Sequence, residues 1–170
     1  PINITVGNDA KCAANAELGF GNLQDIQDGA VVILGTGIGG CIIKDHKVHT
    51  GRHFSAGEFS WIKTDFHDSI SWKNAWCTRN GIKGLLERVQ ENLETEETYT
   101  GIEIFEMANS GDEKVIEAIN QFALEVATQI FNIHAIFDCE ANHLLLQLVE
   151  ILFVLLTFLR ALRELYKIRM

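Results

Sequence analysis

This 170-residue sequence has few basic residues, no paired cysteines and no signal-peptide pattern, and each of these absences excludes a class of protein. Lys and Arg number 14 against 23 Asp and Glu, and the net charge of -9 argues against a nucleic-acid-binding surface. The four cysteines form no Cys-x-x-Cys pair, so neither a disulfide framework nor a zinc site is indicated, and a reducing cytoplasm is the expected compartment. The opening residues, PINITVGNDAK, lack the basic start and the apolar core of a signal peptide.

The residues that are present describe a globular chain that begins with a helix and a β-hairpin. Hydrophobic residues make up 47% of the sequence and charged residues 22%, which suits one domain, or one lobe of a two-lobed protein. A helix is expected over residues 9–19, with Asp9 as its N-cap and Gly19 as its stop. Two β-branched runs, 30–34 and 38–44, predict strands joined through glycines, and KDHK then turns the chain back.

The second half of the chain is expected to be mostly helical. Residues 72–84 look irregular, and helices are predicted over 80–93, over the first part of GIEIFEMANSGD, and over 112–134. The last of these carries one apolar stripe at helical spacing, formed by Val115, Ile119, Phe122, Val126 and Ile130. The sequence therefore predicts an α/β fold with a small mixed sheet, a β-hairpin and long covering helices.

The last thirty residues differ in composition from the rest. Residues 141–170 hold ten leucines against seven in residues 1–140, and their net charge is +2 (4 - 2) against -11 (10 - 21). We therefore divide the chain at residue 140. Polar residues at helical spacings of three, four and seven predict an amphipathic helix for the tail, buried or at an interface such as a homodimer, rather than a membrane span. They are Gln147, Glu150, Thr157, Arg160, Glu164 and Lys167.

The stretch LGTGIGG, residues 34–40, is the first candidate binding motif. Glycines between two strands free backbone amides to face a phosphate, and Thr36 adds a hydroxyl. The alternative is a tight hairpin whose glycines serve only the turn. No Gly-Lys-Ser/Thr follows, so this is not a Walker loop, and the next element is a strand, which argues against a Rossmann loop.

Three motifs together resemble the ROK family of repressors, open reading frames and sugar kinases. They are GNDAKCAANAE, the glycine hairpin and GRHFSAGEFSW, whose order and spacing agree with the family over residues 7–61. The segment IFNIHAIFDCE extends the resemblance, which covers about residues 1–140. The family implies the actin-like ATPase (ribonuclease H-like) superfold, with two α/β lobes around a cleft.

The resemblance also implies roles for seven residues. Asp9 matches the catalytic base, while Asn8 and Glu58 match residues that bind the sugar hydroxyls. The residues expected to meet the nucleotide phosphates, with ATP and Mg²⁺ as cofactors, are Gly35, Thr36, Gly37 and Gly39. Asn8 and Asp9 would also serve as simple helix caps, but the other two motifs favour the base.

The sequence departs from the family pattern around residue 61. Trp61 stands where the family has a zinc-contacting and sugar-contacting His, and is expected to be a core aromatic or else to stack on a sugar. Only Cys77, read as a buried apolar residue, remains of the family's cysteine-rich loop, so structural zinc is not expected. Four further histidines look scattered and solvent-facing rather than clustered on a metal: His46, His49, His53 and His67.

The sequence also lacks two family motifs. It has neither the Asp-x-Gly-Gly-Thr phosphate loop nor, with no glycine after Gly111, the Gly-Gly loop that holds adenosine. We therefore hypothesise that residues 141–170 are not family sequence, and expect little activity from this chain alone. The favoured function is ATP-dependent phosphorylation of a hexose, as in bacterial glucokinases and fructokinases. The alternatives are a non-catalytic sugar-sensing regulator, an interaction domain and a generic phosphate-binding α/β domain.

Overall fold

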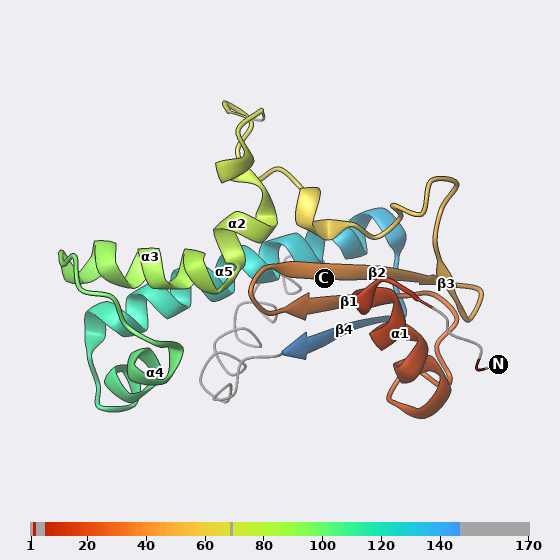
Figure 1. Ribbon diagram of the computed structural model, residues 1–170, viewed down its shortest axis with the longest axis horizontal. Helices are drawn as coiled ribbons and strands as arrows, with labels where there is room; N and C mark the ends of the chain where they lie inside the picture. Colours follow the sequence, from red (N-terminus) through yellow and green to blue (C-terminus); the bar gives the residue numbers. More distant parts are fainter. Residues whose placement is uncertain (1, 3–5, 69, 147–170) are drawn as a thin grey trace, which may run out of the picture.

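The computed structural model describes residues 2, 6–68 and 70–146, which form layers of helix, sheet and helix. Helix α1 lies on one face of the sheet and the long helix α5 runs behind the other, with α3 and α4 extending past the end of the strands (Figure 1). In chain order the elements are α1 (Asp9–Phe20), β1 (Gly29–Leu34), β2 (Ile38–Lys44), β3 (Lys47–His49), α2 (Trp76–Asn80), α3 (Ile82–Leu93), α4 (Gly101–Asn109), α5 (Glu113–Phe137) and β4 (Ala141–Leu146).

The sheet is mixed, as the sequence predicts. Its strand order is β3-β2-β1-β4, with β1 antiparallel to β2, β2 antiparallel to β3, and β4 parallel to β1. Strand β1 lies between two neighbours and is covered on both faces, so all six of its residues are buried. This explains its unbroken apolar run, since a strand buried on both faces has no need for alternating polar residues.

Each face of the sheet forms its own hydrophobic core. Alternate residues of β1, such as Val32, pack against α5, whose predicted stripe from Val115 to Ile130 is buried throughout. The other residues of β1, such as Val31, pack against α1 through the face that carries Ala14 and Leu18. The sheet therefore explains two features of the sequence. Residues 112–134 have helical periodicity because α5 packs on one face of the sheet, and α1 is rich in alanine because it packs on the other.

The predicted helix is wrong over residues 141–146, which form strand β4. The register pairs Gly29 with Ala141 and Leu34 with Leu146. Leucine favours helix locally, but parallel pairing with the buried strand β1 satisfies the backbone groups that the two strands turn toward each other and extends the sheet. The remainder of the predicted helix, and with it most of the apolar face from which dimerisation was expected, lies outside the described residues.

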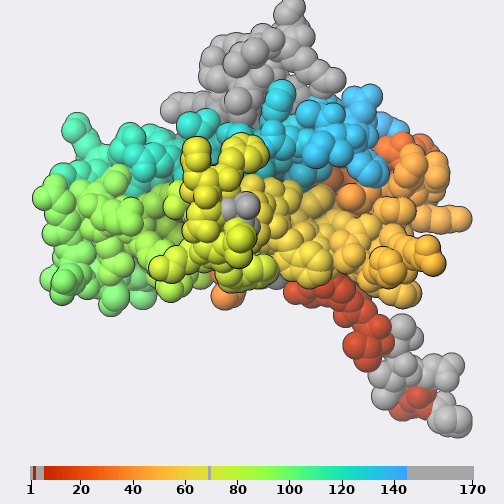
Figure 2. Space-filling model, turned by 90° about the horizontal axis from the view of Figure 1, so that it is seen from above, coloured from red at the N-terminus to blue at the C-terminus, as the bar shows by residue number. Residues whose placement is uncertain are grey.

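Residues 72–84 are more regular than predicted. They contain a 3-10 turn at Trp72–Asn74, all of α2 and the start of α3. The segment before them stands out from the body at the top of Figure 1, and in Figure 2, seen from above, it lies in front of the body. Among the described residues, no helix has the length and apolar character needed to cross a membrane.

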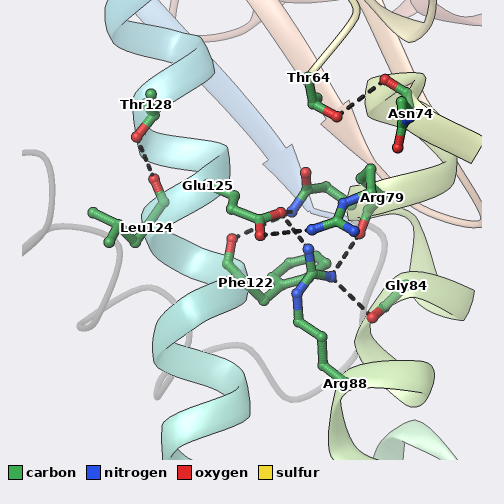
Figure 3. Close-up of polar contacts among 10 residues, drawn as sticks. Thr64, Asn74, Arg79, Gly84, Arg88, Phe122, Leu124, Glu125 and Thr128 are labelled. Atoms are coloured by element: carbon green, nitrogen blue, oxygen red, sulfur yellow. Dashed lines mark hydrogen bonds and ion pairs between the residues drawn. The ribbon is translucent and has the colours of Figure 1, made fainter. Parts of the chain in front are cut away.

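A polar cluster joins α2 and α3 to α5 (Figure 3). Arg88 is only 8% exposed, and its guanidinium donates to the backbone oxygens of Arg79 (2.6 Å) and Gly84 (2.9 Å) and pairs with Glu125. The amide nitrogen of buried Asn80 donates to the same carboxylate at 3.2 Å. Because a buried guanidinium needs a partner for its charge, this cluster fixes the position of the α2–α3 junction on α5.

Replacing Glu125 with alanine is expected to lower the free energy of unfolding by about 2 kcal/mol, because Arg88 then stays buried without its carboxylate. The Glu125 side chain is 36% exposed, so the loss is smaller than for a fully buried pair. Urea denaturation measures it. Glu87→Ala is the matched control, since it removes an exposed ion pair with Lys83 on α3 and should change stability by less than about 0.5 kcal/mol. Equal losses in the two variants would contradict the prediction.

Candidate functional site

The glycine turn between β1 and β2 presents free backbone donors. The amide of Gly35 donates to the carbonyl of Gly37 at 2.9 Å, so this residue does not supply the free amide that we predicted from the sequence. The amides of Thr36 and Gly37 and the Thr36 hydroxyl have no hydrogen-bond partner among the described residues. The turn is therefore a small concavity with unsatisfied donors, which suits an anion.

The start of α3 supports this turn. The amide of Ile82 donates to the Gly35 carbonyl at 3.2 Å. At Gly81 a Cβ would lie 3.0 Å from the Cα of Gly37, so only glycine allows the α2–α3 junction to approach so closely. The amino end of α3 thus faces the turn, and its positive dipole end adds to the attraction for an anion. The sequence signal for this support is the Asn-Gly pair before the apolar run of α3.

The start of α1 carries the two polar residues of the Asn-Asp motif. The side-chain oxygen of Asn8 accepts from the amide of Lys11 at 3.1 Å, so the N-cap is Asn8 and not Asp9 as predicted. One oxygen of Asp9 accepts from the amide of Ala10 at 2.8 Å. Both side chains are exposed. Asp9 is therefore held rigidly at the first turn of a helix while its second oxygen remains available.

Two glycines bring Glu58 close to the strand that follows the turn. Gly57 is buried in the left-handed region at φ +79°, and a Cβ there would lie 2.9 Å from the Cα of Cys41 on β2. On β2 itself, a Cβ at Gly40 would overlap the ring of Phe59 and the carbonyl of Gly57. The segment before Glu58 consequently packs directly on the backbone of β2.

These elements enclose a cavity of about 280 Å³. All seven residues singled out in the sequence line it, although they come from α1, the glycine turn, β2 and the loop before residue 59: Asn8, Asp9, Gly35, Thr36, Gly37, Gly39 and Glu58. A larger cavity of about 930 Å³, between α1 and the β2–β3 hairpin, shares Asn8 and Glu58 with it and is also lined by Lys11 and Phe54. The acidic, amide and backbone donor groups thus converge on one region.

Lys11 is a polar residue of this region that we did not predict. Its ammonium lies 3.2 Å from an oxygen of Glu58 and 3.0 Å from the carbonyl oxygen of Phe54. The available signal was its position three residues after Asn8, which places it near Asn8 on the same face of α1.

The structure revises the sequence interpretations of Trp61 and Cys77 and places a third residue, Cys41, in the core. Trp61 is 57% exposed, so its interpretation as a core aromatic is wrong. Cys77 is only half-buried and lines the smaller cavity. Burial of Cys41 raises the pKa of its thiol to about 11, an effect that Lys11 opposes and Glu58 reinforces. The Cys41 thiol is therefore protonated and unreactive at neutral pH.

No group of three or more His, Cys, Asp or Glu suited to a metal ion occurs in residues 2, 6–68 and 70–146. His46 instead lies with its Nδ1 2.9 Å from the carbonyl oxygen of Ile26. The carboxylates that line the smaller cavity are those of Asp9 and Glu58.

Comparison with known proteins agrees with the fold and with the resemblance. The curated relatives include sugar kinases; for example, a beta-glucoside kinase of Listeria monocytogenes is 29% identical over 139 residues, covering 81% of this chain and 47% of that protein. A ROK family glucokinase from Streptomyces griseus, solved with glucose and AMPPNP, superposes with a TM-score of 0.83 at 23% identity, covering 94% of this chain and 57% of the other. A ROK family transcriptional regulator, a homologue of the Escherichia coli MLC protein, superposes with a TM-score of 0.75 at 22% identity, covering 94% and 43%.

These comparisons confirm the predicted actin-like α/β fold. The chain spans about half the length of the curated relatives it matches. The family model of the ROK family matches residues 1–144, which include the Asn-Asp, glycine-turn and Ala-Gly-Glu motifs and reach into strand β4. The chain therefore belongs to the ROK family.

Proposed function

We propose that this chain supplies the sugar and phosphate sites of a kinase that transfers the γ-phosphoryl group of ATP to a hydroxyl of a hexose. The observation that carries the proposal is the cavity of about 280 Å³ in which the Asp9 carboxylate and the donors of the glycine turn meet. Phosphoryl transfer to an alcohol needs both, since the hydroxyl must lose a proton and the phosphate must be held.

Asp9 acts as the general base. Its first oxygen is bound to the amide of Ala10, which fixes the carboxylate, and the second accepts the proton from the attacking sugar hydroxyl. No side-chain hydrogen bond to the described residues occupies that second oxygen.

Asn8 and Glu58 hold the sugar. The side-chain oxygen of Asn8 caps α1, so its amide nitrogen is the group that donates to a sugar oxygen. Glu58 accepts hydrogen bonds from sugar hydroxyls, and charged acceptors bind hydroxyls more strongly than neutral ones. Because both residues also line the larger cavity, a hexose bound by them reaches from the glycine turn toward α1 and the hairpin.

The glycine turn fits the phosphates of ATP. The free amides of Thr36 and Gly37 and the Thr36 hydroxyl offer donors without any opposing carboxylate in the turn itself, and the positive dipole end of α3 lies behind the turn. Gly39 lines the same cavity from β2, where its lack of a side chain leaves room for a ligand. Mg²⁺ neutralises phosphate charge in such reactions, and it would take most of its ligands from phosphate oxygens and water.

A sugar-sensing regulator is the second candidate function. The structural likeness to a ROK transcriptional regulator favours it, because it shows the same fold in a protein of that class. A regulator needs Asn8 and Glu58 for recognition but does not need Asp9 as a base. Turnover therefore separates the two functions, while sugar binding is common to both.

The test is to measure hexose-dependent ADP release from ATP and Mg²⁺ by this chain, together with sugar binding by calorimetry, for glucose, fructose, mannose and N-acetylglucosamine. We expect at least one sugar to bind and to stimulate ADP release, at a rate below that of a full-length family kinase. Binding without ADP release would point to the regulator or to a kinase site that needs the rest of a longer chain. Absence of both would overturn the proposed sugar site.

A further inference from the structure

We infer that Lys11 is a positioning residue, which holds Glu58 and the loop of residues 51–58 against the start of α1. This inference rests on the proposed function, since it concerns how the sugar-binding carboxylate is placed beside Asn8 and Asp9. Lys11 lies within the GNDAKCAANAE motif, but the resemblance assigns it no role, and the inference comes from the contacts of its ammonium.

The ammonium of Lys11 bridges two parts of the loop. It donates to the carbonyl oxygen of Phe54 at 3.0 Å and to an oxygen of Glu58 at 3.2 Å. The Lys11 and Glu58 side chains are 12% and 27% exposed, so this pair is shielded from water more than an ordinary surface ion pair. In the part of the chain that the structure describes, Lys11 is the only hydrogen-bond partner of the Glu58 carboxylate.

The backbone of this loop needs such a contact. Phe54 has φ +60°, in the left-handed region that bulky residues rarely adopt, and lies between the left-handed glycines Gly51 and Gly57. Its side chain is 74% exposed, so packing of the ring does not hold the conformation. Within the loop, the amide of Ala56 donates to the carbonyl of Thr50 and the amide of Glu58 to the carbonyl of Ser55, both at 3.2 Å. The hydrogen bond from Lys11 adds a contact from α1 to the Phe54 carbonyl, and the same lysine contacts Glu58 four residues later.

This bridge sets the distance between the two halves of the proposed sugar site. Lys11 belongs to the first turns of α1, whose N-cap is Asn8, so its ammonium links that turn to Glu58. One carboxylate oxygen of Glu58 is thereby engaged, which leaves the other to accept from a sugar hydroxyl. Without Lys11, we expect the loop to sample other conformations and Glu58 to lose its fixed place.

Hydrogen exchange tests the bridge without any sugar. In Lys11→Met, the amides of residues 51–58 are expected to exchange at least about tenfold faster than in the wild-type chain, because local opening costs less. Lys47→Met is the matched control: Lys47 lines the same larger cavity, has no ion pair among the described residues, and should leave exchange unchanged. Equal exchange of this loop in Lys11→Met and the wild-type chain would overturn the inference.

A double-mutant cycle then tests whether Lys11 acts through Glu58. Lys11→Met is expected to weaken hexose binding about tenfold in the wild-type background and hardly at all in Glu58→Ala, while Lys11→Arg restores most of the affinity. An equal loss in both backgrounds would show that Lys11 acts independently of Glu58 and would overturn the positioning role. If the wild-type chain binds no sugar, the proposed function fails, and the exchange experiment alone decides whether the bridge orders the loop.

Discussion

Asp9→Asn is expected to lower the rate of hexose phosphorylation by about 100- to 10,000-fold, the usual contribution of a general base, with little change in sugar affinity. Asparagine has nearly the same shape, and its side-chain oxygen still accepts from the amide of Ala10, so the start of α1 is preserved. What it cannot do is take the proton of the attacking hydroxyl. The rate of ADP release measures the loss of phosphorylation, and calorimetry with the bound hexose measures the sugar affinity.

Asp25→Asn is the matched control, because it makes the same chemical change at an exposed residue that lines neither cavity. Its rate should equal that of the wild-type chain. If Asp9→Asn retains the wild-type rate, Asp9 is not the base. If it loses sugar binding as well as turnover, Asp9 is a sugar ligand, and the two experiments together tell these cases apart.

Gly40→Ala is expected to lower the free energy of unfolding by about 3 kcal/mol, at the upper end of the usual cost of overpacking. The added Cβ would overlap the ring of Phe59 and the carbonyl of Gly57 in the buried layer between β2 and the segment before Glu58. Neither neighbour is the end of a flexible side chain, so the segment itself must move. We therefore expect sugar binding to weaken along with stability.

Gly19→Ala is the matched control for this change. Gly19 lies in α1, is exposed, and has no atom within 4 Å of the position that a Cβ would take. Alanine there should raise the free energy of unfolding by up to about 1 kcal/mol, because glycine is a poor helix former. Guanidinium denaturation of both variants measures the two effects. A Gly40→Ala chain as stable as the wild type would contradict the packing of Gly57 on β2.

Much of this protein follows from local patterns in its sequence. The apolar runs predict β1 and β2 because extended chains of β-branched residues suit a buried sheet, and the stripe from Val115 to Ile130 predicts the buried face of α5 because its spacing matches a helical turn. The three motifs also anticipate which seven residues line one cavity. Their roles in binding and catalysis remain predictions.

Other features of the structure depend on contacts between segments that are distant in the sequence. Residues 141–146 are a strand because β1 offers them a buried partner, which their leucine content does not reveal. Trp61 is exposed and Lys11 contacts Glu58 because of where the segment of residues 51–61 lies in the folded chain. The amide of Gly35 is occupied because it donates to the carbonyl of Gly37 within the turn. The spacing of apolar residues in the sequence indicates which face of a helix or strand is buried. Which residue a side chain contacts, and which strand an edge strand pairs with, depend on the tertiary fold.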